Sequence, residues 1–591
     1  MRPSRFLSLV TFRPVRRGFG LADLVVLCLV GGTIAAVVSF AREFEAPLRQ
    51  AVQIDLRPTA LIRYTLFSLS RGVAALIFSF LFALGFGLAA AKSRLAEQLL
   101  LPVLDILQSI PVLGFLPGLV LGLMALFPAR NVGLELAAIL MIFTAQAWNL
   151  ALSFYNSLKS VPDALRDACG VAGWGAGRTF RQLELPAAAQ GLVWNGMLSM
   201  AGGWFFLMVN EAFRLGDKDY RLPGIGSYMS VAQDQGDFRA MGLAILAMVV
   251  MIVAVDQLLW RPLVVWVEQY RLDETTGASG TRSWVLDLLR QSRLPRRAEY
   301  LRLRATRTAR RAARMARPLA RGFEFVRPAL QVAPRVPRIG ATLRRGAVVL
   351  GLLALGAAAG IGVWRFALLL LQLKPGDWGS LAEASGLTFL RVMGAVLIST
   401  AWALPAGIII GRSPRVSQAL QPVIQIVASF PAPMLFPLVI VTLARAGVGL
   451  GLGSVALLVL SGQWYILFNV ISAVAAVPEQ LKEATSVFRL SSWATWRGLW
   501  IPAAFPALVT GWVTAAGGAW NGSIVAEYLV AGGTLRSTTG LGSLISDATA
   551  HADFPLLAGG ITLMSMIVVG WNRTVWRRLA GVAQHRYGMT Q

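Results

Sequence analysis

The sequence predicts an all-α integral membrane protein with about twelve transmembrane helices, arranged as two six-helix halves in a parallel repeat. Three observations support this fold class. Of the 591 residues, 56% are hydrophobic and 14% are charged, whereas soluble domains carry about 25% charged residues. Long apolar runs recur along the whole chain, and the second half repeats the first. A mean hydropathy of +0.62 means that the chain has too few polar residues to cover the surface of a soluble protein of this length.

A helix that crosses a bilayer needs about 20 mostly apolar residues. The first half contains such runs at 20–40, 64–91, 99–127, 133–156, 187–213 and 239–266, and the second half at 346–372, 386–411, 417–445, 449–474, 503–531 and 555–577. The run 20–40 is long for a signal peptide, so we expect a retained anchor. We expect prolines to break or kink the third run of each half, at Pro111, Pro117, Pro431 and Pro437.

The basic residues predict the orientation. They gather at the N-terminus and in the loops after the even-numbered runs, while the opposite loops have fewer basic residues and carry Asp217, Asp219, Asp234, Asp237, Asp377, Glu383, Asp547 and Asp553. The positive-inside rule therefore places both termini in the cytoplasm. This distribution explains the net charge of +26 without nucleic acid, because nucleic-acid binding requires a basic face on a soluble surface. Two cysteines and two histidines support neither a disulfide framework nor a metal site.

The chain divides into a first half at 1–269, an Arg-rich cytoplasmic linker at 270–345 and a second half at 346–591. The linker is predicted either to form basic amphipathic helices on the anionic membrane lipid of the inner leaflet, or to be solvated without a specific partner.

The two halves match in register. The span Pro162 to Pro186 has the same length as Pro478 to Pro502, and the match extends to Trp204 with Trp520. Each half has an even number of runs, so both halves enter the membrane from the same side. We therefore expect the solute path at the interface between the halves.

The loops at 157–186 and 475–502 are copies of each other, and both lie on the predicted cytoplasmic side. A proline followed by acids signals a helix start in each copy, and small residues leave room for a close-fitting partner. We expect a short helix and then a second helical stretch that ends at Pro186 or Pro502.

These loops resemble the EAA loop of ABC importer permeases, the binding-protein-dependent inner-membrane components. The first copy keeps the acid, the alanine and the glycine as Asp167, Ala168 and Gly173, whereas the second has Arg489 in place of the glycine. Because arginine stands in place of glycine, the tight bend or close approach that glycine permits is in doubt in the second loop. The resemblance assigns contact with the ATPase to Pro162, Leu165, Asp167, Ala168, Gly173, Pro186, Pro478, Leu481, Glu483, Ala484, Arg489 and Pro502.

The resemblance implies a type I importer-like permease of a bacterial inner membrane, with two cytoplasmic ABC ATPase subunits and a periplasmic solute-binding protein as partners. It is closest to the nitrate, sulfonate and taurine branch, which implies a small anion as substrate. The sequence has no Gly-x-x-x-x-Gly-Lys-Ser/Thr phosphate loop. ATP and Mg²⁺ are therefore expected on a separate subunit, with no cofactor, metal or catalytic residue in this chain.

Polar residues within apolar runs are candidates for the path, because they are costly in lipid and usually face inward. The main candidates are Arg71, Arg391, Gln108, Gln425, Trp204, Trp520, Glu211 and Glu527; further ones are Ser109, Gln146, Asn149, Ser429, Gln463 and Asn521. The arginine pair either attracts an anion or extends to the interface. For the two glutamates, structural hydrogen bonds are favoured over solute contact.

Two other functions remain open at this point. An ion-coupled secondary transporter can also have a parallel repeat, although it needs no docking loops. A membrane enzyme is disfavoured by the scarcity of histidine and cysteine.

Overall fold

The computed structural model describes residues 31–32, 37–47, 53–216, 218–270, 283–291, 356–357, 360–531 and 533–587. The chain forms two compact units, 1–34 with 282–372 and 35–281 with 373–591. The described part of the first unit contains helix α13, Trp284–Gln291, and an apolar helix, Gly360–Leu370. Most of the run 20–40 and of the linker lies outside the described residues, as do 346–355 and 358–359 of the run 346–372.

The second unit contains both repeats. The elements of the first half are α3 (Pro58–Lys92), α4 (Arg94–Ser109), η1 (Val112–Phe115), α5 (Leu116–Leu126), α6 (Val132–Lys159), α7 (Asp163–Val171), α8 (Ala176–Thr179), η2 (Phe180–Glu184), α9 (Leu185–Glu211), β1 (Arg214–Leu215), β2 (Lys218–Asp219), α10 (Ile225–Asp234), α11 (Phe238–Val255), η3 (Asp256–Trp260), α12 (Arg261–Val267) and η4 (Glu268–Tyr270).

The second half repeats this order. Its elements are α16 (Pro375–Gly411), α17 (Pro414–Ser429), η6 (Ala432–Met434), α18 (Phe436–Arg445), α19 (Leu450–Ala475), α20 (Glu479–Val487), α21 (Ser492–Thr495), η7 (Trp496–Trp500), α22 (Ile501–Ala526), β3 (Tyr528–Ala531), β4 (Thr534–Ser537), α23 (Leu541–Ala550), α24 (Phe554–Trp571), η8 (Asn572–Trp576) and α25 (Arg577–Tyr587).

Within the described residues, eight helices are long and apolar enough to cross a membrane. They are Pro58–Lys92, Val132–Lys159, Ala176–Glu211, Phe238–Tyr270, Pro375–Gly411, Leu450–Ala475, Ser492–Ala526 and Phe554–Tyr587. The second, fourth, fifth and sixth predicted runs of each half are thereby confirmed as helices long and apolar enough to be spans. Their outward leucines remain exposed, as with Leu81 at 61% and Leu397 at 69%, which suits contact with lipid.

The third run of each half is broken at Pro111 and Pro431, as predicted, whereas Pro117 and Pro437 stand in the first turn of α5 and α18 and do not break them. Helix α4 ends at Ser109, and Ile110 and Pro111 are extended before η1 and α5 begin. The same break separates α17 from η6 and α18 at Phe430 and Pro431. The runs 99–127 and 417–445 are therefore not single spanning helices, because a proline has no N–H for the helix and disfavours α geometry in the residue before it.

The helical stretch after each predicted coupling loop does not end at Pro186 or Pro502, which corrects that prediction. It passes through a π-helical turn, η2 or η7, and continues as α9 or α22. A π turn widens the helix just before the proline, where the missing N–H and the ring would disturb α-helical hydrogen bonding. The fifth span of each half consequently begins earlier than predicted, and it ends before the hairpins β1–β2 and β3–β4.

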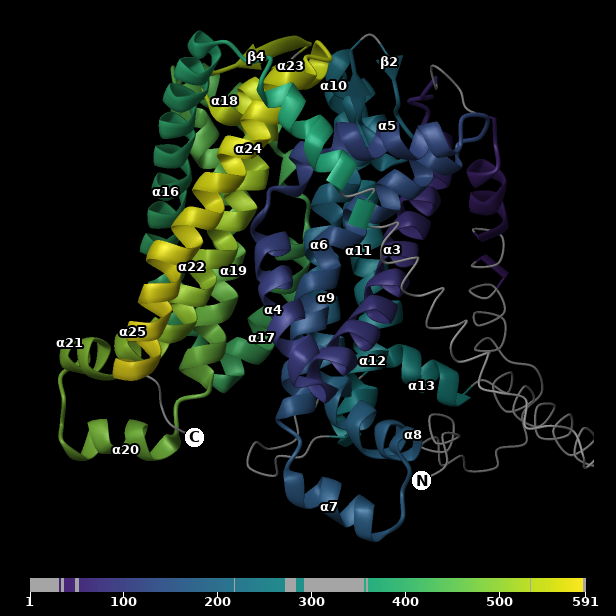
Figure 1. Cartoon of the computed structure of the whole chain (residues 1–591). Helices are drawn as coiled ribbons and strands as arrows, with labels where there is room; N and C mark the ends of the chain where they lie inside the picture. Colours follow the sequence, from purple (N-terminus) through teal and green to yellow (C-terminus); the bar gives the residue numbers. More distant parts are fainter. Residues whose placement is uncertain are drawn as a thin grey trace, which may run out of the picture. The chain divides into compact units, whose positions relative to one another are not determined.

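Each half of this unit is built around three long helices. Helix α6 packs between α3 and α9, and α19 packs between α16 and α22. Contacts between the halves join α9 with α17, and α24 with α4 and η1. Figure 1 shows α7 and α20 at one end of the unit and α10 and α23 at the other. The two repeats are thus oriented the same way, as expected from a parallel repeat.

Candidate functional site: a cavity between the repeated halves

A cavity of about 520 Å³ lies between the two halves. Its walls come mainly from α4, α6 and α9 of the first half and from α17, α19, α22, α24 and η8 of the second. Tryptophans 148, 464, 520, 571 and 576 line it together with phenylalanines 205, 206, 430 and 468. Among the described residues that line the cavity, none is Asp, Glu, Lys, Arg or His. The space is therefore neutral, largely aromatic and shared by both repeats.

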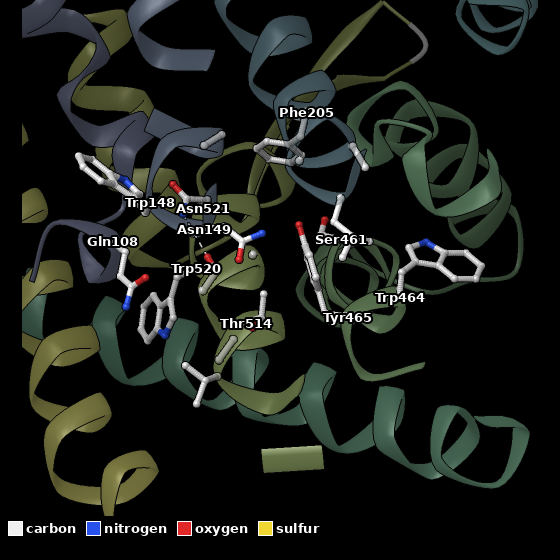
Figure 2. A pocket seen from close by; sticks show the side chains of 18 of the residues that line it. Gln108, Trp148, Asn149, Phe205, Ser461, Trp464, Tyr465, Thr514, Trp520 and Asn521 are labelled. Atoms are coloured by element: carbon white, nitrogen blue, oxygen red, sulfur yellow. Dashed lines mark hydrogen bonds between the residues drawn. The ribbon is translucent and has the colours of Figure 1, made fainter. Parts of the chain in front are cut away.

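Amides and hydroxyls supply the polarity of the cavity, and Figure 2 shows several of them. The Asn149 Nδ2 donates to Ser199 Oγ at 3.2 Å, and the Asn521 Nδ2 donates to the Gly517 carbonyl at 3.1 Å. The Asn521 Oδ1 accepts from the backbone N–H of Leu113 at 3.4 Å, across the interface between the halves. These bonds fix the two amides while leaving a second N–H on each side chain.

The structure brings only some of the predicted path residues together. Gln108, Gln425, Trp520, Asn149, Ser429 and Asn521 line the cavity. Trp204 lies beside it, in a small adjoining pocket that Gln425 also lines. Gln146 is fully buried and accepts a hydrogen bond from Ser79, and Gln463 is buried outside the lining. The side chain of Ser109 lies outside the described part.

The remaining four, Arg71, Arg391, Glu211 and Glu527, lie away from the cavity. In the first half, Arg71 donates from Nε and Nη2 to the Glu135 carboxylate at 2.7 and 2.6 Å. Its Nη1 donates to Glu211 at 2.7 Å and to the Pro223 carbonyl at 2.8 Å. All three charged side chains are 0% exposed. This guanidinium is enclosed by protein acceptors, so the geometry favours a structural role over capture of an anion.

Glu211 joins this cluster to the start of α10. It accepts hydrogen bonds from Ser68 Oγ at 2.8 Å and from the Gly226 N–H at 2.8 Å. These are the structural hydrogen bonds expected of the glutamate pair. The sequence reasoning missed Glu135, although a lone acid in the first turn of an apolar span was a usable signal.

The second half builds the same cluster with one carboxylate fewer. Arg391 donates to Glu527 at 2.8 Å and to the Thr539 carbonyl at 2.8 Å, and Thr388 takes the place of Ser68. In register with Glu135 stands Gly451, whose carbonyl accepts from Arg391 Nε at 3.2 Å. The side chain of Arg391 is 12% exposed. The two halves therefore differ in charge at matching buried positions.

The end of the first half opposite α7 also carries an ion network. Arg221 donates to Asp219 at 2.8 Å and lies 3.5 Å from Asp234. Partial burial would raise the pKa of Asp219, but the Arg221 guanidinium outweighs it and the pKa is lowered. In register with these three residues the second half has Leu535, Ser537 and Ala550, so the network belongs to one half.

The two predicted coupling loops form matching helices at one end of the unit, α7 and α20 (Figure 1). Asp167 and Glu483 are exposed on them, as are Pro162, Leu165, Ala168, Gly173, Pro478, Leu481 and Arg489; Ala484, Pro186 and Pro502 are half-buried. The helix-start signal predicts Pro162 and Pro478 at the first helical position. In the structure each proline is the N-cap, one residue before that position. Asp163 and Glu479 then follow in the first turn, where an acid favours the helix dipole.

The tight bend is present in both loops, although Arg489 replaces the glycine in the second. Gly173 has φ +68°, and Arg489 has φ +50° at the matching position. The closing hydrogen bonds also match: Trp174 N–H donates to Cys169 O at 2.9 Å, and Leu490 N–H donates to Thr485 O at 3.0 Å. A left-handed residue at this place is a common helix C-cap. Nothing within this chain lies within 4 Å of a Cβ added to Gly173, so inside the chain the glycine serves the bend.

Comparison with known proteins identifies both halves. The model of the family described as binding-protein-dependent transport system inner membrane component matches residues 82–259 and 403–571, which together make up more than half of the chain. The two matches fall on the two repeats and include both loop helices.

Individual relatives agree with this. A protein of Methanocaldococcus jannaschii, named as an ABC transporter permease, is 31% identical over 32% of this chain and 67% of its own length. The bicarbonate transport permease of Synechocystis is 26% identical over 29% of this chain and 56% of its own. The nitrate import permease of Synechocystis is 27% identical over 24% of this chain and 48% of its own. The chain thus spans between about half and two thirds of these relatives.

A repeated helical membrane unit, two matching loop helices at one end and two family matches in register all agree. The chain therefore belongs to the binding-protein-dependent transport system inner-membrane components, the permeases of ABC transporters.

Proposed function

We propose that this chain is the complete membrane pathway of an ATP-driven importer in a bacterial inner membrane, with both termini in the cytoplasm. One chain supplies the two halves that separate subunits would otherwise supply. The cavity between the repeats is the solute path, and the solute is a small anion such as nitrate, a sulfonate or taurine. Relatives named for nitrate and bicarbonate transport support the anion.

The observation that carries this proposal is the pair α7 and α20. Two short helices with exposed acids, closed by the same left-handed bend, project from the same end of the two repeats (Figure 1). Each helix docks one cytoplasmic ATPase subunit, which binds ATP and Mg²⁺, and a periplasmic binding protein delivers the solute to the opposite end. Closure of the ATPase pair then moves the halves around the cavity.

The two docking surfaces are unequal. On the second loop, Val487, Phe488 and Trp493 are 76%, 75% and 71% exposed. On the first loop, Val171 is 92% exposed, while Trp174 is half-buried with Arg178 over its ring at 4.7 Å. The second loop therefore offers the larger apolar contact to its ATPase subunit.

Charge reversal on the helices tests the proposal. Asp167→Arg and Glu483→Arg should each reduce the ATPase activity that co-purifies with the tagged chain and abolish ATP-driven anion uptake in proteoliposomes. Asp547→Arg is the matched control for the co-purifying ATPase activity, because this half-exposed acid lies on α23 at the other end. Unchanged uptake in both loop variants would refute docking at these helices. Uptake that needs no ATPase but stops when an ion gradient collapses would favour the secondary transporter.

A further inference from the structure

The size of the cavity exceeds the needs of the simplest anions. The cavity measures about 520 Å³. An ion of four non-hydrogen atoms fills a small share of this space. Sites for organic ligands measure about 300–1,000 Å³, and this cavity falls within that range.

The chemistry of the wall also disfavours a bare ion. An inorganic anion that enters loses its water shell, and no cationic side chain is present among the described lining residues to replace it. Amide, hydroxyl and indole groups supply hydrogen bonds but no opposite charge. An apolar body that packs on the tryptophans and phenylalanines would offset this loss, since buried aromatic area is strongly favourable.

The two halves contribute unlike side chains at matching positions of the cavity. Directly after the matched pair Trp148 and Trp464 stand Asn149 and Tyr465, and directly after Trp204 and Trp520 stand Phe205 and Asn521. Each half thus presents an amide where the other presents an aromatic ring.

This exchange removes the two-fold symmetry that a repeat would otherwise give the cavity. Figure 2 shows all four side chains at the cavity. Each asparagine amide has one N–H engaged within the protein and a second that can donate to a ligand. A site with unlike sides suits a solute with two unlike ends.

We propose that the cavity takes an organic anion with an apolar, ring-sized body and a single oxyanion head, such as an aromatic sulfonate, in preference to nitrate or bicarbonate. This rests on the proposed role of the cavity as the solute path. The ring packs on the aromatic walls, including Phe205 and Tyr465, and the head accepts hydrogen bonds from Asn149 and Asn521.

Titration calorimetry on the full chain in lipid nanodiscs tests this directly, with benzenesulfonate, methanesulfonate, nitrate and benzyl alcohol as probes. Benzenesulfonate should bind at least about tenfold more tightly than methanesulfonate or nitrate, because burial of a phenyl ring contributes that much or more. Benzyl alcohol, which has the ring without the charged head, measures the contribution of the ring alone.

Two variants assign the head site. Asn149→Leu and Asn521→Leu keep the side-chain size and remove the donors, and each should weaken benzenesulfonate about tenfold or more while leaving benzyl alcohol unchanged. Asn156→Leu is the matched control, because Asn156 lies on the same helix α6 but is exposed and outside the cavity.

Three outcomes would overturn the inference: nitrate binding as tightly as benzenesulfonate, no benzenesulfonate binding below about 10 mM, or Asn149→Leu behaving as Asn156→Leu does. The titration contains no ATPase. Its failure is therefore distinct from a failure of docking at α7 and α20, which the charge-reversal variants report.

Discussion

The two buried arginines offer a comparison within one molecule. Arg71→Met removes a cation that faces two carboxylates, whereas Arg391→Met removes one that faces a single carboxylate. Both variants keep a long apolar side chain in the same place. The repeats thus serve as each other's control.

The structure sets the expected magnitudes. Arg71, Glu135 and Glu211 are 0% exposed, and loss of one partner from a buried ion pair costs about 3–5 kcal/mol. Glu527 keeps hydrogen bonds from Thr388 and from the Gly542 N–H. The Arg391 side chain is 12% exposed and faces a single carboxylate, so the loss at that site falls at or below the lower end of this range, about 3 kcal/mol. Arg71→Met should therefore destabilise the chain more than Arg391→Met.

Urea unfolding of the purified chain in detergent micelles, followed by circular dichroism, measures the difference. Adding Glu135→Gln to Arg71→Met should restore about 1 kcal/mol or more, because it removes a stranded buried charge. Equal losses for the two arginines, or no recovery with Glu135→Gln, would show that Glu135 does not set the difference between the halves.

Further predictions concern the backbone. Arg489→Gly should stabilise the chain by about 1 kcal/mol, because glycine adopts the positive φ of this position without strain. Gly173→Arg should destabilise the chain by a similar amount. Thermal unfolding in micelles measures both, and a loss of stability in Arg489→Gly would contradict the strain argument. Gly224→Ala and Gly540→Ala should each destabilise by about 2 kcal/mol or more, since an added Cβ would lie 2.2 Å from the carboxylate of Glu211 or Glu527. Wild-type stability in either alanine variant would mean that the carboxylate clusters yield easily.

The internal repeat placed several features that composition alone would leave open. Matching Pro162–Pro186 with Pro478–Pro502 located both loop helices, and matching Trp204 with Trp520 located two residues at or beside the central cavity. The repeat gave no indication of Glu135, because the matching residue in the second half is a glycine. A partner that lies 64 residues from Arg71 is found only when the helices pack.

The sequence alone determined that this chain is a membrane protein of two parallel halves, because hydropathy and repetition are local properties that lipid and duplication impose on every span. It also located the breaks of the third runs at Pro111 and Pro431, since a proline has no N–H to donate and disfavours helical geometry in the residue before it. Tertiary structure decided that the helices continue through Pro186 and Pro502 by π turns, that Arg71 and Arg391 are enclosed by acceptors, and that a neutral aromatic cavity lies between the halves. These features depend on which distant side chains meet, and pairing across helices leaves no periodic trace in a single sequence.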